Sequence, residues 1–205
     1  MANGAKPAID ILSCDAFAWE LGTLAKEINE DAARSYRVNC IYLTQRLHVD
    51  FNRLGEEVAA ALGKLRGSKV ALLYGSLCHP DFSFLPGGGI HRLKEINCIH
   101  AISGESTAGQ PRSFFLTPSQ LAKWRANFSF DRKGPEEKRD FKERFRKYCD
   151  SAVFLDTGAG AADEKELALF AEATGLAVQK KQIGLAPFRK TLFALLEATW
   201  RGAPP

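Results

Sequence analysis

Three of the five cysteines lie at or near the ends of predicted buried strands. Cys14 ends one apolar run, Cys78 follows a second, and Cys98 lies shortly before a predicted turn. In an open α/β sheet the carboxyl ends of the strands meet in one crevice, where ligands bind. Thiolates are soft ligands that favour zinc, copper or iron–sulfur clusters. Three thiols brought to one crevice would therefore form a metal or iron–sulfur site.

The spacing of the cysteines leaves a second interpretation open. The strongest sequence signal for a thiolate centre is a close Cys-x-x-Cys pair, and this chain has none. Free cysteine is also among the residue types most often buried, so three separate core thiols are the alternative. Cys40, inside a predicted strand, and Cys149, at a predicted helix end, are expected to contribute only to packing.

Two histidines lie close to the second and third of these cysteines. His79 is adjacent to Cys78, and His100 is two residues from Cys98. Either imidazole could add a nitrogen ligand to a metal, or could move protons beside a bound ligand. The alternative is that both are loop or surface histidines. A metal-free enzyme is a further reading, with Cys78 or Cys98 as nucleophile and a nearby histidine as base.

The triplet Asp156-Thr157-Gly158 is the other candidate site. It matches the triplet of aspartic proteases, in which two aspartates face each other and share a proton. Those proteases are nearly all β, whereas this triplet falls between a predicted strand and a predicted helix. The segment Gly158-Ala159-Gly160-Ala161-Ala162 resembles part of a dinucleotide-binding loop, without its third glycine and without an acidic partner after the following strand. We expect Asp156, Thr157 and Gly158 to face the crevice and to bind a cofactor.

Predicted strands and helices alternate along the chain, and they must position these residues. Asp15 is expected to cap the first helix, and Thr117 with Pro118 is expected to begin another. The alternation predicts an α/β fold with a doubly wound, mostly parallel sheet and helices on both faces. Strands are expected at residues 8–13, 38–42, 69–74, 90–96, 114–116, 152–155 and 177–183, and helices at 17–28, 43–65, 118–124, 135–148, 163–174 and 187–200.

Length and composition favour a globular protein in a reducing compartment. The 205 residues suggest a single α/β domain, with residues 1–7 as an N-terminal tail and a polar break at 129–134. No apolar stretch reaches the ~20 residues that span a bilayer, and the N-terminus has no signal-peptide core. Five cysteines, an odd number, disfavour a secreted disulfide framework. We therefore expect a cytoplasmic protein with no membrane partner.

The net charge of +4 has a local origin. Residues 132–147 hold eight basic and four acidic residues, and the rest of the chain is balanced. A general basic footprint for nucleic acid is therefore missing. The acids and bases alternate on the predicted helix 135–148, which is typical of a solvated face, so no nucleic-acid partner is expected.

A series of short motifs gives the chain a resemblance to a known family. In order along the sequence these are Ile11–Cys14, Glu20-Leu21, Leu47-His48, Tyr74–Cys78, Asn97–Ile99, Phe115–Thr117 and Leu155–Gly158. The chain resembles domain-of-unknown-function family 1638 of bacteria and archaea over about residues 8–185. The resemblance implies that Cys14, Cys78 and Cys98 form one pattern. It also implies a partner, since relatives often accompany corrinoid-dependent methyl-transfer systems.

The expected function combines these observations. We expect a metal-binding protein that holds an iron–sulfur cluster, or zinc or another metal, through Cys14, Cys78 and Cys98, with His79 or His100 as a further ligand. Its role would be redox, sulfur or methyl-transfer chemistry. Besides the metal-free thiol enzyme, the alternative is a small-ligand binding module that assembles with a corrinoid enzyme or another metalloenzyme.

Overall fold

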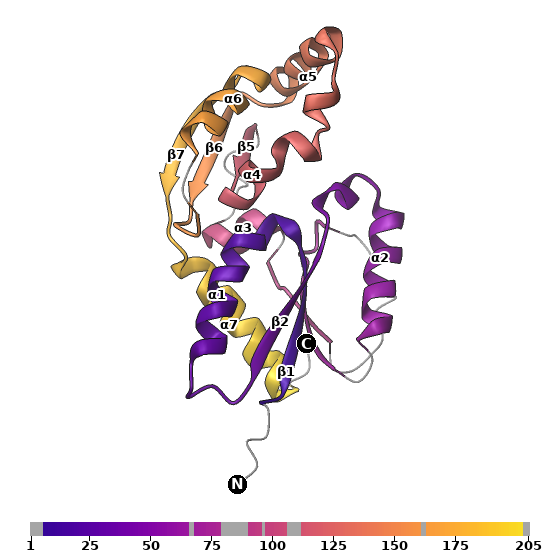
Figure 1. The fold of residues 1–205 in the computed structure, drawn as a ribbon, viewed down its shortest axis with the longest axis vertical. Coiled ribbons are helices and arrows are strands. Elements are labelled where there is room, and N and C mark those ends of the chain that lie inside the picture. The colour runs from indigo at the N-terminus through magenta and orange to yellow at the C-terminus, as the bar shows by residue number, and fades with distance from the viewer. Residues whose placement is uncertain are drawn as a thin grey trace.

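The strands form two separate parallel sheets (Figure 1). The computed structural model describes residues 6–65, 68–78, 90–95, 97–105, 112–160 and 163–202, without the side chains of 48–49. One sheet has the strand order β2-β1-β3-β4 and the other has the order β5-β6-β7. Their bounds are β1 Ala8–Cys14, β2 Arg37–Leu43, β3 Lys69–Leu73, β4 Ile90–Arg92, β5 Ser113–Leu116, β6 Ser151–Asp156 and β7 Ala177–Gln182.

The first sheet and its helices form lobe A, which comprises the described residues of 6–105 and 186–202. Its α-helices are α1 Ala18–Glu30, α2 Phe51–Lys64, α3 Cys98–Ser103 and α7 Ala186–Arg201, with 3₁₀ helices η1 Asp15–Phe17 and η2 Gln45–Val49. α1 and α7 lie side by side, joined by the Arg189–Glu27 ion pair at 2.6 Å, and α2 lies apart from them (Figure 1). The doubly wound α/β class is thereby confirmed.

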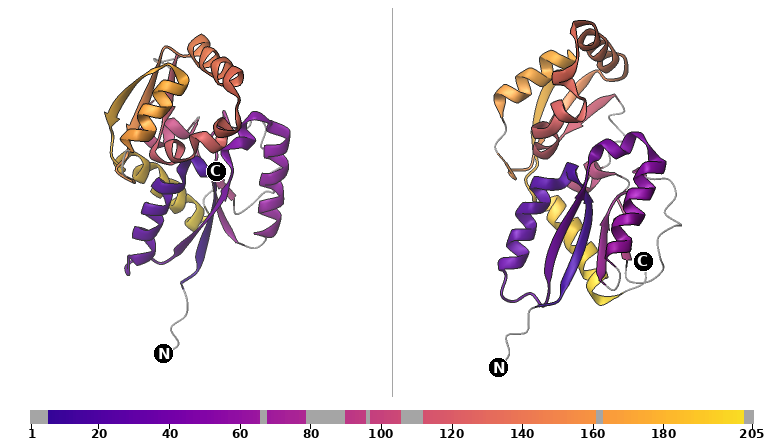
Figure 2. Two further views of the ribbon diagram at one scale, coloured as in Figure 1. Left: turned by 45° about the horizontal axis from the view of Figure 1, so that its top comes forward. Right: turned by 45° about the vertical axis from the view of Figure 1, so that its right-hand side comes forward.

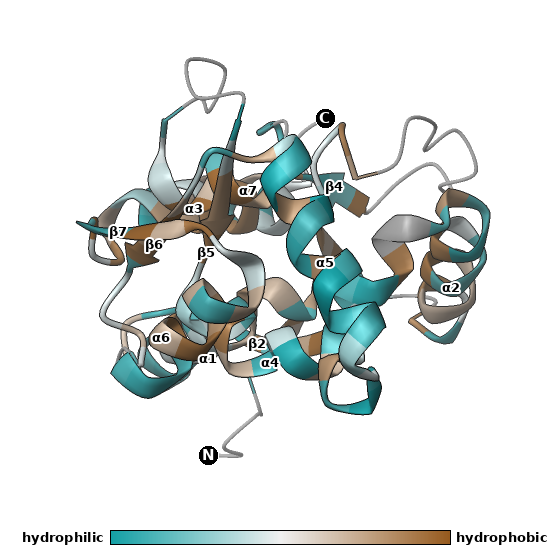
Figure 3. Ribbon diagram, turned by 90° about the horizontal axis from the view of Figure 1, so that it is seen from above, coloured by the Kyte–Doolittle hydropathy of each residue, from teal (hydrophilic) through white to brown (hydrophobic). Residues whose placement is uncertain are grey.

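Lobe B comprises the described residues of 112–182. Its helices are α4 Pro118–Asn127, α5 Pro135–Tyr148 and α6 Glu164–Thr174, with the 3₁₀ helix η3 Phe130–Arg132 in the predicted polar break. α5 begins at Pro135 and consists mostly of hydrophilic residues (Figure 3). No described helix of either lobe is long and apolar enough to cross a membrane.

Each lobe has its own hydrophobic core. The core of lobe A is built by β1, β3 and the inner faces of α1, α2 and α7. The core of lobe B is rich in aromatic rings, with Phe170 within 5.8 Å of Phe114 and 5.4 Å of Trp124 between ring centroids. The sequence predicts the strands but not their division, because strand periodicity does not say which strand a neighbour pairs with. β5 pairs with β6 and leaves β4 at an edge.

The two lobes meet at the carboxyl ends of their strands. α1 begins just after β1, and α4 begins just after β5 (Figure 2). The backbone N–H of Trp19 donates to Ser119 Oγ at 2.7 Å, and Thr117 Oγ1 donates to the carbonyl of Ala16 at 3.3 Å. These contacts close a seam between lobe A and lobe B. Ligand sites of α/β proteins lie at such strand ends.

Two local expectations are wrong, for identifiable reasons. The predicted helix 43–65 is divided, because Thr44 caps η2 and Asp50 separately caps α2 by accepting from Arg53 N at 3.1 Å. Asp15 does not cap α1: its carboxylate accepts from Gln45 N at 2.7 Å and pairs with Lys123 at 3.1 Å. Asp15 therefore binds residues that are distant in the sequence, instead of the first backbone N–H groups of α1.

The glycines inside helices give a first prediction. A Cβ added at Gly22 in α1 or Gly63 in α2 would meet nothing within 4 Å. Ala loses less backbone entropy on folding than Gly, so G22A and G63A should each raise the free energy of unfolding by about 0.5–1 kcal/mol. G175A is the contrasting control, because Gly175 has φ +68° and an added Cβ would lie 2.8 Å from Lys142 Cε. Urea denaturation checks all three, and unchanged or lower midpoints for G22A and G63A would contradict the prediction.

Candidate functional site

The three candidate cysteines occupy three different elements at the carboxyl edge of lobe A. Cys14 is the last residue of β1, and its Sγ accepts a hydrogen bond from Ala16 N at 3.4 Å. Cys78 follows β3 in a turn closed by its own N–H on the carbonyl of Gly75 at 3.1 Å. Cys98 is the first residue of α3, which Asn97 caps. Cys14 and Cys78 thus follow neighbouring parallel strands, whereas Cys98 lies at the start of a helix rather than at the end of a strand.

The three thiols lie within one another's electrostatic reach. The pKa of Cys14 is raised well above its usual range, first by burial and then by the charges of Cys98 and Cys78 among others. Burial raises the pKa of Cys98 to about 12, and the charge of Cys78 adds to this increase. The pKa of Cys78 is also raised by burial, although its own turn and Arg92 oppose the shift. The structure therefore brings the three sulfurs to one desolvated region.

The thiols do not form a closed ligand set. Among the described residues, no group of three or more His, Cys, Asp or Glu side chains is arranged so that it could hold a metal ion. All five cysteines are free. Cys40 is partly buried against the core of lobe A, and Cys149 packs against the core of lobe B. Any metal centre would therefore require the three crevice thiols to move toward one another.

The histidines and the Asp156 triplet occupy different surroundings. His79 lies outside the described residues. His100 lies on α3, and its buried Nδ1 has no hydrogen-bond partner among the described residues. Residues two positions apart on an α-helix differ in direction by about 200°. The side chain of His100 therefore leaves α3 on a different side from that of Cys98. Asp156 accepts from Gly158 N at 3.0 Å, which stabilises the turn after β6.

A fully buried carboxyl group lies at the seam beside these residues. Glu20, in the first turn of α1, has no exposed surface. Ser119 Oγ donates to Glu20 Oε2 at 2.6 Å, and Thr157 Oγ1 donates to Oε1 at 3.3 Å. Burial raises the pKa of Glu20 above its ordinary value of 4.5, although hydrogen bonds from Ser119 and Thr157 oppose the shift. The charge of Glu20 in turn contributes to the raised pKa of Cys98.

The partners of Glu20 come from the strand ends of lobe B. Ser119 lies in the first turn of α4, whose start is fixed by a capping box between Thr117 and Gln120. Thr157 directly follows β6, and both hydroxyl residues are buried. The seam therefore joins the carboxyl ends of both sheets through one acidic side chain. Thr157, which the sequence analysis expects to bind a cofactor, donates its hydroxyl to Glu20 at this seam.

Glu20 is a residue that the sequence analysis missed as a site residue. It lies on the same helical face as Phe17, Leu21 and Leu24, which are all buried. A charged residue inside an apolar stripe indicates a buried carboxyl, and that signal was available in the spacing. Ser119 had no such signal, because serine is ordinary in the first turn of a helix.

A tryptophan closes the outer end of the seam. A Cβ added at Gly160 would lie 2.2 Å from Trp19 Cε3, so the indole occupies the space above this glycine. Trp19 also lines a pocket of about 460 Å³ whose other walls come from lobe B, among them Pro118, Arg125 and Glu166. This pocket shows that the seam has room for a small molecule at its rim.

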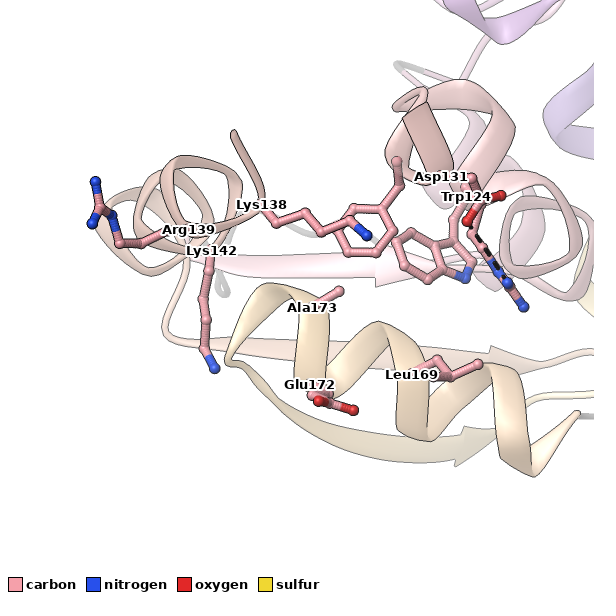
Figure 4. Close-up of a pocket in the computed structure, with 10 residues that line it drawn as sticks. Trp124, Asp131, Lys138, Arg139, Lys142, Leu169, Glu172 and Ala173 are labelled. Atoms are coloured by element: carbon pink, nitrogen blue, oxygen red, sulfur yellow. Dashed lines mark ion pairs between the residues drawn. The ribbon is translucent and has the colours of Figure 1, made fainter. Parts of the chain in front are cut away.

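A second pocket, of about 440 Å³, lies wholly within lobe B (Figure 4). Its floor is formed by Trp124 and Phe130, and Lys138 lies over the Phe130 ring at 5.1 Å from the centroid. Arg139 and Lys142 point away from the aromatic floor. No cysteine or histidine lines it. The thiols and Glu20, rather than this pocket, carry the reactive side chains.

The fold and the seam define a two-lobed α/β protein with three thiols and a buried acid at its strand ends. The chain belongs to a family described as "Protein of unknown function (DUF1638)", whose model matches residues 42–192. The matched range contains Cys78, Cys98 and the Asp156 triplet, and it begins after Cys14 and Glu20. No curated protein and no solved structure gives a significant match.

Proposed function

We propose that the chain binds a thiophilic metal centre through Cys14, Cys78 and Cys98, either an iron–sulfur cluster or zinc or another soft ion. The observation that supports this is that all three thiols are desolvated, and that the charges of neighbouring thiols add to the raised pKa of Cys14 and of Cys98. The charge of a metal favours thiolates over thiols.

The chemistry of the donor set suits such a centre. All three thiols are held protonated by burial, so metal binding would release their protons and depend on pH. Three protein thiolates leave one position open on a four-coordinate centre, and an open position is where a metal accepts an external ligand. The bound centre would supply redox, sulfur or methyl-transfer chemistry. The protein residues would exclude water and position the ligand at the seam.

Metal analysis of cysteine variants tests this proposal. The full chain, purified without oxygen, is expected to contain iron with sulfide, or zinc, and C14S, C78S and C98S should each lose it. C40S and C149S are matched controls, since both remove a free cysteine away from the crevice and should retain the metal. A metal-free wild-type protein, which also fails to bind added Zn²⁺ or to accept a reconstituted cluster, would contradict the proposal.

A metal-free thiol enzyme is the second candidate for the same crevice. Such an enzyme needs a thiolate near neutral pH, whereas burial raises the pKa of Cys78 and of Cys98. Iodoacetamide should therefore label neither residue at pH values near neutrality in the folded chain. Rapid labelling of Cys78 or Cys98 under these conditions would favour the enzyme over the metal centre.

The remaining parts of the proposal concern location and partners. A cytoplasmic location would keep the five cysteines reduced. The pocket at the rim of the seam suits a small molecule, and a corrinoid enzyme or another metalloenzyme is the partner we propose. Co-purification with a corrinoid protein from the native cells would support this association, and its dependence on Cys98 would connect it to the crevice.

A further inference from the structure

Glu20 is an unusual residue for a lobe interface, because its carboxyl group is buried without a cationic partner among its hydrogen bonds. Its two oxygens accept from uncharged donors, namely the hydroxyls of Ser119 and Thr157 and backbone N–H groups. The nearby cation Lys123 is paired with Asp15 instead. Hydroxyl donors return less of the hydration energy of a carboxylate than a cation would. The chain therefore retains an acid where its charged form is costly.

A structural tie would not require a carboxyl group. Glutamine at this position has nearly the same shape, and its carbonyl oxygen would accept from Ser119 Oγ just as Glu20 Oε2 does. Its amide group could then donate to the Thr157 hydroxyl. An amide would hold the two lobes together without the cost of burying a charge. What distinguishes the carboxyl group is its exchangeable proton.

The position of Glu20 gives that proton a use. The residue lies where α1 leaves the carboxyl end of β1, and its partners lie where α4 and β6 meet the same seam. The titratable groups that respond to its charge are Cys98 on α3 and Tyr42 on β2. The charge of Glu20 thus contributes to the raised pKa of Cys98, one of the three crevice thiols.

We propose that Glu20 is the proton-transferring residue of the crevice, held in place by Ser119 and Thr157, for a small-molecule ligand that binds beside the three thiols. When it accepts, an X–H bond of the ligand breaks, its electron pair stays on the ligand, and an O–H bond forms on the carboxyl group. When it donates, the same step runs in reverse, and no electron is gained or lost. Ser119 and Thr157 are positioning residues. This inference rests on the proposed function for the identity of the ligand.

The first test compares the pH dependence of unfolding in the wild type and E20Q. Above pH 4.5 the unfolded chain has lost the Glu20 proton while the folded chain retains it. The unfolding constant of the wild type should therefore rise by up to about tenfold per pH unit from 4.5 to the folded pKa, and then level off. E20Q should lack this component and should be as stable as the wild type, or more stable, at neutral pH. E20Q that loses as much stability as E20A would make Glu20 a structural tie and overturn the inference.

The second test observes the proton directly. Between pH 4.5 and the folded pKa of Glu20, infrared spectroscopy of the full chain should show the carbonyl stretch of a buried protonated carboxyl group that is missing in E20Q. Zn²⁺ bound by three thiolates has one net negative charge where three thiols had none, so adding Zn²⁺ should strengthen this band. A band that does not respond to bound Zn²⁺ would overturn the inference. If Zn²⁺ binds neither protein, the proposed function fails, while the pH comparison still decides whether Glu20 titrates.

Discussion

Replacing Phe170 by alanine should unfold lobe B while lobe A remains folded. Phe170 is fully buried, and its ring lies against those of Phe114, Trp124 and Phe145. Removing the ring takes away its buried apolar surface and leaves a cavity in the aromatic core. Such truncations cost about 3–5 kcal/mol, a large part of the stability of a small lobe.

The separation of the two cores makes this effect local. Phe170 belongs to the core of lobe B, and none of that core's residues belongs to the core of lobe A. Hydrogen exchange read by mass spectrometry should show F170A losing protection in β5, β6 and α6 while β1 and β3 keep theirs. L169A is the matched control, because Leu169 is 43% exposed and its loss should change stability by no more than about 0.5 kcal/mol. Equal loss of protection in both lobes would show that they unfold as one unit.

The ends of several helices can be predicted from the sequence of this chain, whereas the pairing of its strands and the contacts between its lobes cannot. The helix 135–148 matches α5 at both ends, because Pro135 begins it and Tyr148 is the last residue before an extended Cys149. The Asp163 cap and the Gly175 stop of α6 are likewise local signals, and both are confirmed. These features depend only on side chains that act on their own backbone within a few residues.

The seam depends on contacts that no local signal specifies. Ser119 and Thr157 reach Glu20 across 99 and 137 residues of chain, respectively. Serine and threonine occur so often at caps and turns that neither residue type indicates a buried acid as its partner. The shared edge of Cys14 and Cys78 was predictable for a different reason: they follow the paired parallel strands β1 and β3, and parallel strands bring their carboxyl ends to one edge whatever the rest of the fold does. The division into two sheets then placed a second set of strand ends opposite the first.

Removing the hydroxyl of Ser119 should weaken the seam more than any other single-atom change there. Ser119 Oγ donates to Glu20 at 2.6 Å and accepts from Trp19 N at 2.7 Å, and the residue is completely buried. S119A leaves a buried carboxyl group and a backbone N–H without this partner. Unsatisfied buried groups cost about 1–3 kcal/mol, and more when they are charged, so we expect a loss of about 2–3 kcal/mol in the free energy of unfolding. T23A, which removes an exposed hydroxyl from the same helix, should cost no more than about 0.5 kcal/mol.

The pH dependence of S119A has a definite sign. The hydrogen bond from Ser119 lowers the pKa of Glu20, so S119A should raise that pKa further above 4.5. The folded chain then keeps its proton to a higher pH, and the fall in stability with rising pH should extend over a wider range than in the wild type. In the E20Q background the same substitution should cost less, because no charge is left unsatisfied, and the double-mutant cycle should give a coupling of about 1–2 kcal/mol. Additive effects of the two substitutions, measured by urea denaturation at neutral pH, would show that Ser119 supports the seam without supporting the charge on Glu20.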